Sequence, residues 1–166
     1  MCGIVGAIDS RITENKLFKS ISVLRHRGPD SSGVFLDVSL GVGIGHSRLS
    51  IIDLKTGDQP LFSIDRNIAL VCNGEIYDFE RIRADLKKQD YRFRTKSDSE
   101  VIIYLYLKYG LEFFDHLRGE FSFLLLDRSR KRLIACRDRF GIKPLYVATT
   151  DANGWIFASE VKAIFA

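Results

Sequence analysis

The sequence lacks any long hydrophobic run and has only 3 prolines among its 166 residues. The apolar stretch from Val101 to Leu107 is far shorter than the ~20 residues that a membrane-spanning helix needs. No linker, repeat or low-complexity segment divides the chain, and its first residues lack the basic and apolar regions of a signal peptide. With 46% hydrophobic and 28% charged residues, the composition is that of one globular domain over residues 1–166. We expect a soluble, cytoplasmic protein with no membrane partner.

The sequence also has few cysteines and no large excess of positive or negative charge. Lys and Arg number 25 against 21 Asp and Glu, and the resulting charge of +4 is scattered along the chain. Nucleic-acid binding would need a clustered basic face, so no nucleic-acid partner is expected. The three cysteines cannot all pair and form no C-x-x-C motif, which argues against a disulfide framework or structural zinc and favours a reducing compartment. His26, His46 and His116 are too dispersed to suggest a metal centre.

The apolar pattern predicts strands joined as hairpins, with helices between them. Strands are expected at 3–8, 33–38, 41–47, 68–72, 121–127, 133–137, 145–149 and 155–158, and helices at 13–25, 77–88, 101–109 and 111–117. Ser97-Asp98-Ser99-Glu100 matches a capping box that opens the third helix. Gly41-x-Gly43-x-Gly45 predicts the close approach of a backbone or a ligand. The pattern favours an α+β protein with antiparallel sheets over a parallel doubly wound fold.

Cys2 is unusual because of its position. Removal of Met1 would place a thiol and a free α-amine on one residue. The amine, with an ordinary pKa of about 7.7–8.0, can take the proton of a thiol whose ordinary pKa is about 8.5. Such a residue can be nucleophile and base together. The alternative is a small hydrophobic residue at the start of a buried strand.

Several sequence blocks together resemble one family. They are Met1-Cys2-Gly3-Ile4-Val5-Gly6, Arg25-His26-Arg27-Gly28-Pro29-Asp30, His46-Ser47-Arg48-Leu49-Ser50-Ile51-Ile52-Asp53, Gln59-Pro60-Leu61, Asn73-Gly74-Glu75-Ile76-Tyr77, Ser97-Asp98-Ser99-Glu100 and Arg137-Asp138-Arg139-Phe140-Gly141-Ile142-Lys143-Pro144-Leu145-Tyr146. In these blocks the chain closely resembles the glutaminase domain of glutamine-hydrolysing asparagine synthetases, which are class II glutamine amidotransferases. The blocks keep the family's order up to Ala163, so the resemblance covers essentially the whole chain.

The resemblance implies the fold of the N-terminal-nucleophile hydrolases: four layers, αββα, with two stacked antiparallel sheets between helices. It also implies that Cys2 attacks the side-chain amide of L-glutamine and releases ammonia through a γ-glutamyl thioester that water hydrolyses to glutamate. No cofactor is implied for this domain. ATP and Mg are expected only for the family's synthetase domain, in cis or in trans, which these residues do not include.

The resemblance assigns the oxyanion hole of this reaction to the side-chain amide of Asn73 and the backbone N–H of Gly74. Each such donor is worth roughly 3–4 kcal/mol of barrier. Without the family, Asn-Gly is more often a turn.

The resemblance assigns substrate binding to a second group of residues. Arg48 matches the residue that holds the α-carboxylate of glutamine, a role that suits a guanidinium. Glu75 and Asp98 match the groups around the α-ammonium. The backbone of Leu49, Ser50, Ile51 and Ile52 matches a pocket-lining stretch. Each has a simpler alternative: a surface ion pair for Arg48, a helix-dipole charge for Asp98, and core packing for the apolar residues.

The remaining conspicuous residues stay outside the expected site. Cys72 and Cys136 lie on expected strands and are interpreted as inert core thiols. The sequence does not indicate what Arg25 to Asp30 does, and Arg137 to Tyr146 serves identification more than mechanism.

The residues leave two other functions open. One is a catalytically silent docking domain of the same fold, which retention of Met1 would favour. The other is an amidotransferase half that serves an acceptor other than aspartate. Oligomeric state and the ammonia acceptor are not readable from these residues.

Overall fold

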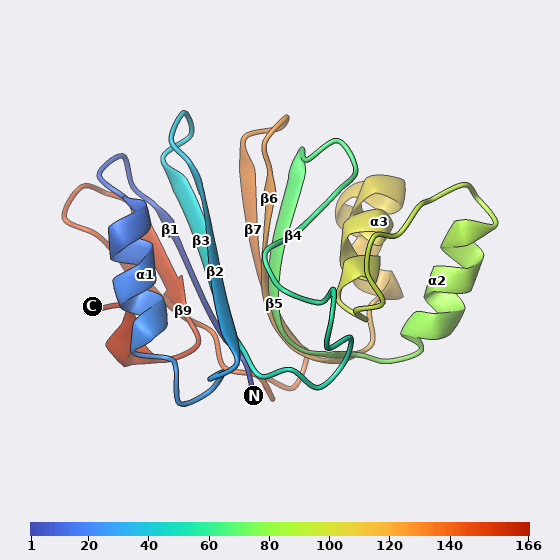
Figure 1. The fold of residues 1–166 in the computed structure, drawn as a ribbon. Coiled ribbons are helices and arrows are strands. Elements are labelled where there is room, and N and C mark those ends of the chain that lie inside the picture. The colour runs from blue at the N-terminus through green and yellow to red at the C-terminus, as the bar shows by residue number, and fades with distance from the viewer.

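The computed structural model describes all 166 residues, whose strands form two antiparallel sheets stacked face to face (Figure 1). The five-stranded sheet, here called sheet A, has the order β2-β3-β1-β9-β8. Its strands are β1 (Gly3–Ile8), β2 (Ser31–Asp37), β3 (Val42–Arg48), β8 (Tyr146–Thr149) and β9 (Trp155–Ala158). The four-stranded sheet, sheet B, has the order β4-β5-β6-β7. Its strands are β4 (Leu61–Phe62), β5 (Ile68–Ile76), β6 (Gly119–Asp127) and β7 (Arg132–Arg137).

Helices cover the outer face of each sheet, so the molecule has four layers (Figure 1). Helix α1 (Glu14–Ser22) lies on sheet A, whereas α2 (Phe79–Lys87) and α3 (Glu100–Tyr109) lie on the side of sheet B. Two short 3-10 helices are η1 (Gly110–His116) and η2 (Val161–Ala163). This arrangement confirms the αββα layers that the family resemblance implied. None of the helices has the length and apolar character that crossing a bilayer requires.

The hydrophobic core follows the layers. Between the two sheets lie Ile4, Val42, Ile44, Ala69, Val71, Leu124 and Leu126. A larger cluster packs α3, which is buried along most of its length, against the other face of sheet B. On the far side, Leu17, Ile21 and Leu24 of the α1 region pack on Val5 and Ala158 of sheet A. The helical spacing of these three leucine and isoleucine side chains predicted this packing correctly.

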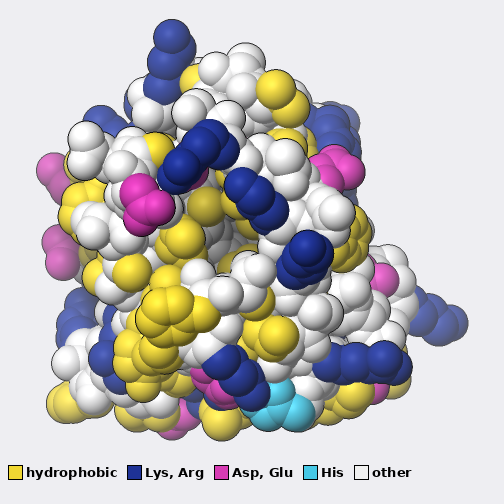
Figure 2. All heavy atoms as spheres, turned by 90° about the vertical axis from the view of Figure 1, so that its left-hand side faces the viewer, with side chains coloured by type: hydrophobic (Ala, Val, Ile, Leu, Met, Phe, Trp, Pro, Cys, Tyr) yellow, Lys and Arg dark blue, Asp and Glu magenta, His cyan; other side chains and the backbone are white.

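The alternating glycines of β3 serve helix packing. A Cβ at Gly43 would come within 2.5 Å of Leu17, and one at Gly45 within 2.9 Å of Ile21. Side chains of the α1 region therefore make the close approach at these two positions, and not the backbone or ligand that was expected. Figure 2 shows this outer face of the molecule, where Lys and Arg side chains are interspersed with hydrophobic, acidic and neutral groups around a hollow.

The structure differs from the expected elements in three places that matter for the site. Strand β5 continues through Asn73 and Gly74 to Ile76, so these residues lie in a strand and the turn alternative is wrong. The short β4 was not anticipated. The capping box is also wrong: Ser99 is the N-cap of α3 without a side-chain cap bond. The Glu100 carboxylate instead accepts hydrogen bonds from the backbone N–H groups of Arg94 and Thr95, both at 2.8 Å.

Candidate active site

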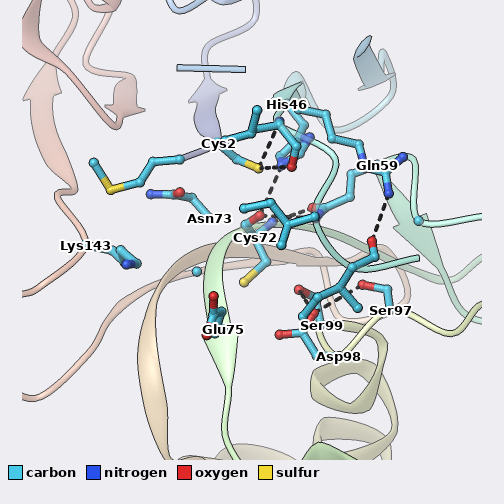
Figure 3. A pocket seen from close by; sticks show the side chains of 17 residues that line it. Cys2, His46, Gln59, Cys72, Asn73, Glu75, Ser97, Asp98, Ser99 and Lys143 are labelled. Atoms are coloured by element: carbon cyan, nitrogen blue, oxygen red, sulfur yellow. Dashed lines mark hydrogen bonds between the residues drawn. The ribbon is translucent and has the colours of Figure 1, made fainter. Parts of the chain in front are cut away.

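One cavity gathers nearly all of the side chains that the sequence singled out (Figure 3). It lies where β1 and β3 of sheet A meet β5 of sheet B and the start of α3. The expected residues that line it are Cys2, Arg48, Leu49, Ile51, Ile52, Asn73, Gly74, Glu75 and Asp98. Ser50 is the exception, because it does not line the cavity. Its backbone N–H donates instead to the Asp30 carboxylate at 2.7 Å.

Cys2 stands at the end of β1, which is an interior strand of sheet A between β3 and β9. Its Sγ accepts the N–H of Leu49 at 3.4 Å and lies 3.6 Å from the carbonyl oxygen of the same residue. Burial raises the pKa of the Cys2 thiol, against the opposing effects of the Leu49 hydrogen bond and the nearby positive charges. The thiol is therefore neutral at physiological pH and needs a base before it can act as a nucleophile.

The Arg25–Asp30 motif, whose role the sequence did not indicate, holds the residues around Cys2. Arg27 Nε donates to the Cys2 carbonyl oxygen at 2.8 Å, and the same guanidinium pairs with Glu160 at 3.0 Å. His26 and Lys162 also contact Glu160, at 2.9 Å and 3.2 Å. Together with the bond from Ser50 to Asp30, these contacts brace the cysteine and the segment after β3.

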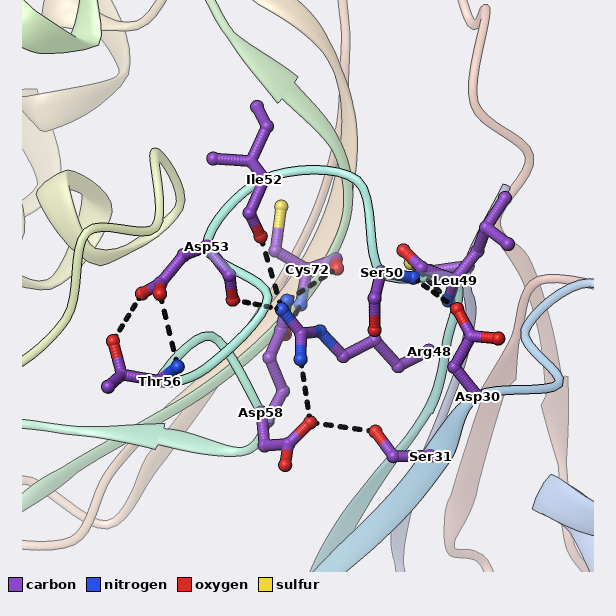
Figure 4. Close-up of polar contacts among 12 residues, drawn as sticks. Asp30, Ser31, Arg48, Leu49, Ser50, Ile52, Asp53, Thr56, Asp58 and Cys72 are labelled. Atoms are coloured by element: carbon purple, nitrogen blue, oxygen red, sulfur yellow. Dashed lines mark hydrogen bonds and ion pairs between the residues drawn. The ribbon is translucent and has the colours of Figure 1, made fainter.

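Arg48 is the last residue of β3, and its guanidinium is held from two sides (Figure 4). One terminal nitrogen pairs with the Asp58 carboxylate at 2.8 Å, and the other donates to the carbonyl oxygens of Ile52 and Asp53 at 3.1 Å and 2.6 Å. A guanidinium has five N–H donors. These three bonds leave two donors for a ligand, so an almost fully buried, oriented positive group faces the cavity.

Asn73 and Gly74 lie side by side in β5 at the cavity wall. The side-chain nitrogen of Asn73 is buried and has no hydrogen-bond partner in the protein. A buried donor without a partner is costly, so the Asn73 amide is available to donate to a ligand atom in the cavity. Gly74 has a φ of 149°, and a Cβ there would lie 2.0 Å from the Glu120 carbonyl oxygen. Only glycine can therefore occupy this position without moving the backbone of β6.

Asp98 and Glu75 place two carboxylates on the same side of the cavity. Asp98 is buried at the start of α3, and its Oδ2 accepts the N–H of Ile76 at 2.8 Å. Burial raises the pKa of Asp98, with a further contribution from Glu75, although hydrogen bonds from Ile76 and Ser99 oppose the shift. A ligand cation beside Asp98 would favour its ionised form.

Sequence reasoning missed several other lining residues. These are Met1, His46, Gly57, Gln59, Cys72, Ser97, Ser99 and Lys143. Cys72 had been interpreted as a core thiol. It is buried as expected, and burial strongly raises its pKa, yet it also faces the cavity. The cavity-facing positions of Gln59 and Lys143 could have been suspected only from the family-like blocks that contain them, because neither residue has a local pattern of its own.

The arrangement suits a small zwitterion that carries a reactive carbonyl. Arg48 can bind a carboxylate, the Asp98 and Glu75 pair can bind an ammonium, and the Cys2 thiol and the Asn73 amide lie on the cavity wall between the two sheets. No three His, Cys, Asp or Glu side chains gather as a metal site would require. The individual roles of these residues stay predictions.

Comparison with known families gives one match across the chain. The model of the glutamine amidotransferase domain matches residues 1–166.

Curated relatives of two kinds are similar to the chain. Asparagine synthetase [glutamine-hydrolyzing] 3 of Arabidopsis thaliana is 46% identical over 99% of the chain. Amidase chry2 of Gibberella zeae is 45% identical over 95% of it. The chain spans only 28% and 23% of the lengths of these two proteins.

A solved structure has the same fold. The glutamine phosphoribosylpyrophosphate amidotransferase of B. subtilis superposes with a TM-score of 0.81 over 99% of this chain and 43% of its own, at 24% identity. At that identity the likeness concerns the fold alone.

Proposed function

Because the chain belongs to the family of glutamine amidotransferase domains, we propose that it hydrolyses the side-chain amide of L-glutamine to glutamate and ammonia. The observation that carries the proposal is the orphaned side-chain nitrogen of Asn73 in the cavity that also holds the Cys2 thiol. A donor without a protein partner beside a nucleophile is what a developing oxyanion requires.

The reaction requires removal of Met1, whose side chain is exposed. The freed α-amine of Cys2 takes the thiol proton, and the thiolate attacks the amide carbon of glutamine. The carbonyl oxygen becomes an oxyanion that accepts hydrogen bonds from the Asn73 side chain and the Gly74 N–H. The carbon–nitrogen bond then breaks, and the proton held by the amine leaves with the nitrogen as ammonia. The γ-glutamyl thioester remains on Cys2.

Hydrolysis of the thioester completes the cycle. The α-amine takes a proton from water, the resulting hydroxide attacks the thioester carbon, and the thiolate leaves and is reprotonated. Arg48 holds the α-carboxylate of the substrate throughout, with two guanidinium donors left free by its protein contacts. Asp98 and Glu75 hold the α-ammonium. These contacts set the distance of the amide from Cys2.

The ammonia serves an ATP-dependent synthetase partner, in cis or in trans. Asparagine synthesis is the first candidate, since plant asparagine synthetases match 99% of the chain. An acceptor other than aspartate is the second, because a fungal amidase is 45% identical, nearly the same value. The reaction needs Cys2 as a free thiol, and none of the three cysteines is in a disulfide. A reducing, cytoplasmic location fits this need.

The test compares ammonia release from glutamine by the processed protein and by Cys2→Ala. Intact-mass measurement first establishes that Met1 has been removed. We expect activity in the processed protein, none in Cys2→Ala, and little in protein that retains Met1. Equal ammonia release from the wild type and Cys2→Ala would favour a silent docking domain and sink the proposal.

A further inference from the structure

The side chain of Gln59 makes the two hydrogen bonds to β5 that the backbone of a longer β4 would make. Strand β4 pairs with β5 through Leu61 opposite Leu70 and Phe62 opposite Ala69. The same register, continued beyond the end of β4, places Gln59 opposite Cys72. There the Gln59 side-chain amide donates to the Cys72 carbonyl oxygen at 3.1 Å and accepts the Cys72 N–H at 2.6 Å. Both backbone groups of Cys72 are thus satisfied by one side chain (Figure 3).

His46 contacts the same peptide from the opposite sheet. Its Nε2 lies 3.1 Å from the Cys72 carbonyl oxygen, and a carbonyl can only accept, so Nε2 carries the proton. Burial lowers the pKa of His46 to about 4, so the ring is neutral and its Nδ1 has no proton. The Cys72 carbonyl therefore receives one donor from β3 of sheet A and one from the segment before β4.

The peptide group that Gln59 and His46 bind is next to the residues of the proposed oxyanion hole. The carbonyl of Cys72 and the N–H of Asn73 belong to one planar peptide group. In a strand, the backbone groups of residues two apart point to the same edge. The Gly74 N–H therefore points to the same edge of β5 as the Cys72 backbone groups that Gln59 binds, two residues further along the strand. Holding the Cys72 peptide in place therefore fixes the Asn73 backbone, from which its side chain extends, and the direction of the Gly74 N–H.

We propose that Gln59 is a positioning residue that aligns the oxyanion donors of Asn73 and Gly74 by clamping the backbone of Cys72, with His46 as the second anchor. The inference rests on the proposed glutamine hydrolysis. Gln59 also lines the cavity, so a direct contact with the substrate is the competing role. The two roles separate in kinetics: lost alignment lowers kcat, whereas a lost ground-state contact raises KM.

The test uses Gln59→Met, which keeps the length of the side chain and removes both bonds. Ser63→Ala is the matched control. It removes a side-chain bond to the same strand, 2.9 Å from Oγ to the N–H of Ile68, far from Asn73. We expect Gln59→Met to lower kcat for glutamine by about 10- to 100-fold, since loss of a whole oxyanion donor costs about 10²–10³. KM should stay within about twofold. Ser63→Ala should lower the unfolding temperature and leave kcat unchanged.

Three results would overturn the inference. If kcat is unchanged in Gln59→Met while the processed wild type is active, the positioning role of Gln59 is refuted and the proposed function is not. A rise in KM without a fall in kcat assigns Gln59 to the substrate. Lack of hydrolysis by the processed wild type refutes both this inference and the proposed function. Where Gln59→Met does not fold, Gln59→Glu replaces it: the carboxylate keeps the bond from the Cys72 N–H, has no donor for the carbonyl, and must also lower kcat.

Discussion

The two walls of the cavity are held by different kinds of interaction. The nucleophile wall, formed by Cys2 and Arg48 at the ends of β1 and β3, is braced by charged side chains that reach the surface, such as the pairs of Arg27 with Glu160 and Arg48 with Asp58. The oxyanion wall, formed by Asn73 and Gly74, lies inside the ladder that joins β5 to β6 along nine residue pairs. By contrast, Cys2 precedes the first pair of β1, and Arg48 is in the last pair of β3.

The two walls are therefore expected to differ in their sensitivity to salt, to acid and to substitution. Ion pairs near the surface contribute roughly 0–1 kcal/mol each and weaken with salt and acid. The backbone hydrogen bonds of a buried sheet are insensitive to salt and acid, but they tolerate no change of backbone conformation. We therefore expect substitutions in the oxyanion wall to have large effects, and substitutions in the supports of the nucleophile wall to have small effects that depend on conditions.

Within the oxyanion wall, Asn73→Ala is expected to give the largest effect on rate. Loss of one oxyanion donor lowers kcat by about 10²–10³, or about 2.7–4 kcal/mol. The free energy of unfolding should change by less than about 1 kcal/mol, because the lost nitrogen has no protein partner. Steady-state ammonia release and urea denaturation measure the two quantities. A fall in kcat of less than tenfold would remove Asn73 from the reaction.

Gly74→Ala is expected to break the oxyanion wall itself. The new Cβ would meet the Glu120 carbonyl oxygen at 2.0 Å in a strand with a φ of 149°. We expect a loss of about 3 kcal/mol in the free energy of unfolding, from backbone strain and displacement of β6. Gly110→Ala is the control, since its φ is 60° but nothing lies within 4 Å of the new atom. It should cost about 1 kcal/mol. Equal costs in urea denaturation would contradict the proposed steric cause.

Arg48→Lys tests the ligand-binding part of the nucleophile wall. An ammonium cannot reproduce the planar set of donors, so we expect KM for glutamine to rise by about 10- to 100-fold, from about 1.5–3 kcal/mol of lost charge-assisted bonds. Arg11→Lys, in an exposed pair with Asp9, is the control and should leave KM unchanged. A KM within twofold of the wild type would mean that Arg48 only supports the fold.

The pH dependence of glutamine binding tests Asp98. Its pKa is raised above the usual carboxyl value, chiefly by burial, and a bound ammonium favours the ionised form. Glutamine binding is therefore strongest above the raised pKa, and KM should rise as pH falls through it, by up to about tenfold per unit. In Asp98→Asn this rise should disappear while KM is high at every pH. Persistence of the same rise in the variant would point to another group.

Glu160→Gln should give the smallest effect. Burial would raise the pKa of Glu160, but hydrogen bonds from Arg27, His26 and Lys162 outweigh it and lower the pKa to about 2. Because this value lies below the usual carboxyl range, the stabilisation is present above pH 4.5 and is lost as pH falls towards 2. Because glutamine keeps a side-chain oxygen that can accept the same hydrogen bonds, we expect Glu160→Gln to lose only the charge, at a cost of at most about 1 kcal/mol at neutral pH that salt reduces further. Thermal unfolding of the wild type and the variant at low and high salt would measure it, and a salt-independent difference would contradict the ionic origin.

Much of the fold followed from local patterns. The spacing of Leu17, Ile21 and Leu24 correctly predicted a helical segment packed on one side. The strand expected at 155–158 is β9, with the same bounds. The four-layer arrangement came from the family resemblance, because strand order depends on contacts between distant residues. Asn73-Gly74 shows the limit of local rules: the dipeptide favours a turn, yet pairing with Ser122 and Phe121 holds it in a strand.

The residues that the resemblance pointed to lie together in one cavity except Ser50, but the contacts that support them were not predicted. The resemblance supplied Cys2 and Arg48 without showing that Arg27 or Asp58 contacts them. Those contacts join residues that are 25 and ten positions apart and do not share a helix or strand, so no helix or strand spacing rule applies. Ser50 was expected to line the cavity, but its backbone N–H points away from it and donates to the Asp30 carboxylate.

The interior position of β1 has a practical consequence. The strand begins at Gly3 between β3 and β9, and Met1 already lines the cavity. An affinity tag fused in front of Met1 would be tethered at the mouth of this cavity at a very high local concentration. It would act as an inhibitor joined to its own target, and it would also keep the amine of Cys2 blocked. Preparations of this protein for enzymology therefore need their tag at the other end of the chain.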